Sequence, residues 1–72
     1  MMPASDYRDA MEVLGLDHNG MAALFGFEAR TSRRYARDRD IPKYVERWIR
    51  YVLRTKAKPE EVMALLEKEE AG

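Results

Sequence analysis

The most regular pattern in the chain is a set of five apolar residues between positions 45 and 53. They lie at i, i+3, i+4, i+7 and i+8, and they are Val45, Trp48, Ile49, Val52 and Leu53. Because that spacing is typical of one helical face, we predict a helix over residues 42–55 with Pro42 in its first turn. A chain of 72 residues forms one domain at most, so this face must belong to its single core. Trp48 is therefore expected to pack there rather than to stack on a base.

Four further segments are predicted to be helical, namely residues 6–14, 18–25, 29–37 and 59–69. Residue types favoured at helix ends set these bounds: Ser5 and Asp17 as N-caps, Gly15 and Gly26 after C-terminal ends, and Pro59 at a first helical position. The Val and Ile residues show no period-2 alternation, which disfavours a sheet. The sequence therefore predicts a single all-α domain of five helices over residues 1–72.

The core of this domain must be stabilised by packing alone, because the chain has no cysteine and hence no disulfide. Helical spacing selects the residues expected in it. They are Met11, Leu14, Ala22, Phe25, Tyr35, Trp48, Ile49, Val52 and Leu65.

The net charge of zero conceals three blocks of opposite sign. Residues 1–29 carry a net charge of −4, and residues 59–72 also carry −4. Between them, residues 30–58 hold eleven Arg or Lys against three acids, a net charge of +8. A segregated basic block suggests a polyanionic partner.

Within that block, four arginines follow the spacing i, i+3, i+4 and i+7: Arg30, Arg33, Arg34 and Arg37. On a helix their mutual repulsion costs about 1–2 kcal/mol in total. A phosphate-lined groove would offset that repulsion. The alternative is a solvated face paired with nearby acids, namely Glu28, Asp38 and Asp40, but these are too few to neutralise the block.

The stretch LGLDHNGMAALFGFEARTSRRYARDRDIP, residues 14–42, joins two short predicted helices by a turn that contains Gly26. Ala22 supplies the small residue that the helix crossing needs, and Gly26 tolerates the positive φ of the turn. With these residues in register, the chain over about residues 5–55 resembles the Cro/CI (lambda-repressor-like, XRE) helix-turn-helix family. Its short length and the RRY of residues 33–35 are also similar to small phage repressors, including anti-CRISPR-associated regulators.

The resemblance implies a lambda-repressor-like fold with a helix-turn-helix over about residues 17–37 and residues 29–37 as the recognition helix. The residues it directs toward the bases of the major groove are Ala29, Arg30, Arg33 and Arg34. Candidates for phosphate contacts are His18, Asn19, Arg37, Arg39 and Lys43. An arginine fork fits guanine and phosphate equally well, so the sequence does not assign one partner to each arginine.

Three positions depart from the family pattern. Ser32 stands where Val or Ile is usual, Glu28 replaces the usual Ser or Thr cap, and His18 replaces the usual Gln. We expect Ser32 to permit close helix approach, with its hydroxyl bonded to a carbonyl one turn earlier. His18 is expected either to contact a phosphate at a helix N-terminus or to be an ordinary surface histidine.

These features predict a sequence-specific DNA-binding transcription regulator that represses by blocking a promoter as a homodimer on a palindrome. Residues 59–69 are expected to form the dimer interface, with Tyr51, Met63 and Leu66 as candidates. The alternative is that this helix only covers its own core. Alternative functions are a protein-interaction module, such as an antitoxin or adaptor, and binding of structured RNA.

Catalysis is not expected, because one His, no Cys and no paired acids leave little for an enzyme to use. A metal site is disfavoured, since His18 has no second His or Cys to complete it. No cofactor or small-molecule ligand is evident. The opening MMPASDYRDA lacks the basic and apolar regions of a signal peptide, and no apolar run approaches the roughly 20 residues of a membrane span. We therefore expect a cytoplasmic protein without membrane contact.

Overall fold

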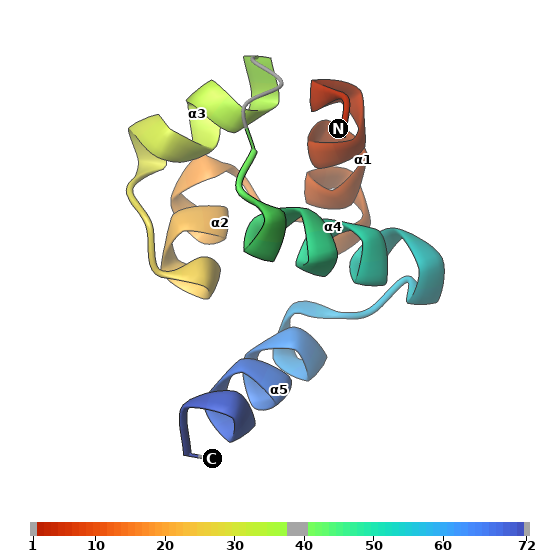
Figure 1. Ribbon diagram of the computed structural model, residues 1–72, viewed down its shortest axis with the longest axis vertical. Helices are drawn as coiled ribbons and strands as arrows, with labels where there is room; N and C mark the ends of the chain where they lie inside the picture. Colours follow the sequence, from red (N-terminus) through yellow and green to blue (C-terminus); the bar gives the residue numbers. More distant parts are fainter. Residues whose placement is uncertain (1, 38–40, 72) are drawn as a thin grey trace.

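The computed structural model describes residues 2–37 and 41–71, with side chains to residue 68. Within these ranges the chain forms five helices and no strand: α1 (Ala4–Leu14), α2 (His18–Phe25), α3 (Ala29–Arg37), α4 (Lys43–Thr55) and α5 (Pro59–Ala71). The prediction of an all-helical chain is confirmed. Figure 1 shows α1 to α4 gathered into one body and α5 below them, beyond the 56–58 connection.

The two glycines and the aspartate around α2 have their predicted roles. Asp17 is the N-cap of α2 and its carboxylate accepts a hydrogen bond from the Gly20 N–H at 2.8 Å. Gly15 and Gly26 follow α1 and α2 with φ of 68° and 82°, a left-handed conformation that favours glycine. These turns set the directions in which α2 and α3 leave their predecessors.

Pro59 begins α5 as predicted, but three other predicted helix ends need correction. Helix α1 begins at Ala4, and the residue at its N-cap is Pro3, not Ser5, because extended Pro3 already offers its carbonyl to the Asp6 N–H at 3.0 Å. Pro42 likewise precedes α4 as its N-cap instead of occupying its first turn. Helix α5 continues to Ala71 rather than ending near residue 69.

The core contains most of the residues selected by helical spacing. Those confirmed as buried are Leu14, Ala22, Phe25, Tyr35, Ile49 and Val52. Met11 and Trp48 are only partly buried at its edge. The core also contains buried side chains that were not predicted. They are contributed by the start of the chain, by α1, α2, α4 and α5, and by the α4–α5 connection, and they include Met2, Tyr7, Ala10, Met21, Leu24, Val45, Ala57 and Val62.

Leu65 is the clear error in the predicted core, since 37% of it is exposed. Lys56 ends α4 in a left-handed conformation, with φ of 55°, and Ala57 is buried in the connection. Helix α5 then packs against the body through fully buried Val62 and partly buried Leu66, near α2. Leu65 faces the space beside α4 instead. Because α5 contacts the body through few side chains, part of its apolar surface stays uncovered.

Candidate nucleic-acid interface

Helix α3 has one face in the body and one in solvent. Ser32 and Tyr35 are buried, whereas Arg30, Arg33 and Arg34 are exposed. The inner face packs against α1 and α2, and Tyr35 contacts the rings of Tyr7 and Phe27 edge-on. The structure thus gathers the predicted base-reading arginines on one solvent face, with Ala29 partly buried at the start of the helix.

Arg30, Arg33 and Arg34 have little compensation from acids among the described residues. Arg30 Nε lies 3.5 Å from Glu28 Oε2, but both side chains are largely exposed, so the pair contributes little to stability. Arg34 lies over the Tyr35 ring, 5.5 Å from its centroid, and Arg33 forms no ion pair with the described residues. Arg37 continues the exposed stripe at the end of α3. The predicted pairing with Asp38 and Asp40, and the candidate Arg39, lie outside the described residues.

A buried hydrogen-bond chain holds α3 from behind. The Ser32 hydroxyl lies 2.6 Å from the Tyr7 hydroxyl of α1 and 2.8 Å from Nδ1 of His18, the first residue of α2. The prediction that Ser32 bonds to a carbonyl one turn earlier is therefore wrong. Its side chain points into the junction of three helices, where Tyr7 and His18 supply partners that no local pattern shows.

The burial of Tyr7 determines which group donates in each of these hydrogen bonds. Burial raises the pKa of Tyr7, so its hydroxyl stays protonated, and Ser32 is its hydrogen-bond partner in the described structure. If Tyr7 donates to Ser32 and Ser32 donates to His18 Nδ1, both buried hydroxyl hydrogens are satisfied. Any other order leaves one of them without an acceptor, which is costly. In this arrangement a neutral His18 carries its proton on Nε2.

The predicted phosphate candidates lie on different elements. His18 is half-buried against Ser32 and is thus neither a free surface histidine nor isolated from α3. Asn19 is exposed beside it in the first turn of α2, and Lys43 is exposed at the start of α4. Arg8, which the sequence did not single out, extends from α1 and donates to the Ala36 carbonyl in the last turn of α3.

The predicted dimer candidates do not form one surface. Met63 and Leu66 line a hollow between α5 and the end of α2, whereas Tyr51 lines a separate groove between α4 and α5. Met63 is exposed, and Tyr51 and Leu66 are partly buried. An interface centred on α5 would therefore use Met63 and Leu66 from one side and Tyr51 from the other.

The described residues form neither a cluster of metal ligands nor a membrane-spanning helix. No three His, Cys, Asp or Glu side chains among the described residues come together as metal ligands would. None of the described helices combines the length and apolar character needed to cross a membrane.

Comparison of the chain with protein-family models, curated proteins and solved structures found no match.

Proposed function

We propose that this chain is a sequence-specific DNA-binding regulator of transcription that acts as a repressor. The observation that carries the proposal is the outer face of α3, where Arg30, Arg33 and Arg34 are exposed together on a short helix. In a lambda-repressor-like arrangement α3 would enter the major groove, where an arginine fork can bond guanine O6 and N7. The arginine repulsion that weakens the free helix would be relieved against DNA.

The buried face of α3 supports this role by fixing the helix. Tyr35 anchors the hydrophobic side, Ser32 joins α1 and α2 through hydrogen bonds, and Arg8 binds the C-terminal end. A recognition helix gains specificity when its side chains approach the bases from a defined position. These contacts would hold the arginines at defined positions relative to the bases.

The start of α2 is the proposed phosphate contact. His18 with its proton on Nε2 has a donor that the Ser32 bond does not use. Exposed Asn19 lies beside it, and the backbone N–H groups of His18 and Asn19 remain for an anion, because the Gly20 N–H is already bonded to the Asp17 carboxylate. A phosphate there would position α3 without specifying sequence.

We further propose that two copies bind a palindromic site through α5, because one recognition helix contacts only a few base pairs. Met63 remains 42% exposed on α5, and Leu65 of the same helix remains 37% exposed. Two α3 helices would then lie about 34–36 Å apart, one turn of B-DNA.

Selection of bound duplexes from a random library tests this function. A palindromic consensus with half-sites one turn apart is expected, together with binding that weakens steeply as salt is raised. No enrichment, with binding of structured RNA in competition against duplex DNA, would favour the RNA alternative. Salt-independent capture of a protein partner would favour an interaction module.

A further inference from the structure

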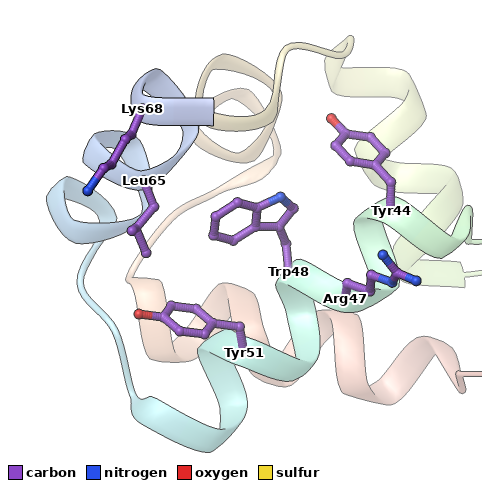
Figure 2. Close-up of a pocket in the computed structure, with 6 residues that line it drawn as sticks. All are labelled: Tyr44, Arg47, Trp48, Tyr51, Leu65 and Lys68. Carbon is purple, nitrogen blue, oxygen red and sulfur yellow. The ribbon is translucent and has the colours of Figure 1, made fainter. Parts of the chain in front are cut away.

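A second surface, remote from the outer face of α3, is the groove between α4 and α5. Its volume is about 510 Å³, and it is lined by Tyr44, Arg47, Trp48, Tyr51, Leu65 and Lys68. Figure 2 shows the Trp48 indole between the rings of Tyr44 and Tyr51, with Leu65 of α5 on the opposite wall. The size lies within the range of small-molecule sites.

The aromatic wall is held in place by contacts with the body. The Tyr44 hydroxyl donates to the Phe25 carbonyl at 3.0 Å. The Trp48 ring lies 6.4 Å from that of Phe25 and meets Tyr51 edge-on at 5.8 Å. These rings are fixed before any partner arrives, so little ordering would oppose binding.

The polar groups of the groove favour an anion. Arg47 and Lys68 lie on opposite sides of the indole (Figure 2), and neither forms an ion pair with the described residues. The Trp48 indole N–H and the Tyr51 hydroxyl likewise make no hydrogen bond within the described part of the chain. None of the described residues that line the groove carries a carboxylate. Planar apolar surface with donors and cations around it complements an aromatic acid.

We propose that this groove binds a planar aromatic carboxylate, with its ring against Trp48 and its carboxylate at Arg47 or Lys68. The α4 wall spans the eight residues from Tyr44 to Tyr51, about 10 Å along the helix, whereas the described part of the α5 wall consists of Leu65 and Lys68, one turn apart. Such an unequal pair of walls suits a ring-sized body better than a partner helix, which needs several successive anchors. The proposal is independent of DNA binding.

Trp48 is the only tryptophan of the chain, so its indole N–H gives one NMR signal in ¹⁵N-labelled protein. Titration with 2-naphthoate is expected to shift that signal saturably, with Kd on the order of 0.1–1 mM for a ligand of this size. The uncharged isostere 2-naphthamide should bind more weakly. The Arg47→Gln/Lys68→Gln double variant should lose about three- to tenfold in naphthoate affinity.

Arg54→Gln, on the same helix but outside the groove, is the matched control and should bind naphthoate as the unaltered protein does. Circular dichroism would verify that the variants fold. Equal binding of acid and amide, no shift at 10-fold above the expected Kd, or an unaffected double variant would overturn the proposal. So would a Trp48 shift that follows protein concentration alone, since a second copy would then occupy the groove.

Discussion

Along α3, the side chains that face the body and those that face solvent differ in both burial and chemistry. Ser32 and Tyr35 are closed off from water and joined to α1 and α2, while Arg33 and Arg34 project away from the body. Neighbouring residues of α3 thus have different roles. Folding and the proposed DNA binding should therefore be separable on this helix.

The largest effect is expected on the inner face. Tyr35→Ala should lower the free energy of unfolding by about 3–5 kcal/mol, because it removes a buried ring that contacts Tyr7 and Phe27. Urea unfolding, monitored by circular dichroism, measures this loss of unfolding free energy. Arg33→Ala, two positions earlier, should change stability by less than about 0.5 kcal/mol. Similar losses for both would erase the distinction between the faces.

Next come the exposed arginines. Arg33→Ala and Arg34→Ala should each weaken binding to a selected site by about 1–3 kcal/mol, and weaken binding to random duplex by less. Competition binding with the two duplexes provides the measurement. Arg54→Ala, which removes an exposed arginine from the last turn of α4, is the control. If both duplexes lose affinity equally, the two arginines contact the backbone rather than bases.

An effect of similar size, on stability rather than on DNA affinity, is expected on the inner face at the buried hydrogen-bond chain. Ser32→Ala should cost about 1–3 kcal/mol of stability because it leaves the Tyr7 hydroxyl buried without a partner. Adding Tyr7→Phe should recover part of that loss, so the double variant is less unstable than the sum of the singles predicts.

The single histidine of the chain also allows a direct check of this hydrogen-bond chain. The ¹⁵N shifts of its neutral ring should identify the tautomer protonated on Nε2. Additive losses in the double variant would contradict the hydrogen bond between Tyr7 and Ser32. A proton on Nδ1 would contradict the order of donors assigned to the hydrogen-bond chain.

The smallest effect concerns Lys43, exposed at the start of α4. If Lys43 meets a phosphate, Lys43→Ala should weaken all duplexes alike and lower the slope of log K against log salt by about one unit. Affinity measured across a salt series decides this. A loss confined to the selected site would show that Lys43 takes part in base recognition.

Local signals in the sequence predicted the framework of this fold. Asp17 and Gly26 were identified because capping and a positive φ depend on a few neighbouring residues. The period of α4 located Ile49 and Val52 in the core, since a wide apolar face has only one way to be buried. The arginine stripe was likewise visible from spacing alone.

Contacts between distant segments were not predictable in the same way. The partners of Ser32 come from residues 7 and 18, and nothing near Ser32 in the chain indicates them. Leu65 was expected in the core, but its exposure depends on the direction α5 takes after Lys56. The groove beside Trp48 arises from that same direction, so periodicity could not reveal it.

NMR mapping with duplex DNA is the most direct test of the central claim, that the outer face of α3 is the recognition surface. With a selected duplex, the largest amide shifts should fall in residues 29–37 and at His18 and Asn19, and the Arg33→Ala/Arg34→Ala variant should lose most of them while keeping its fold. Shifts centred on α5, or an unaltered pattern in that variant, would contradict the claim.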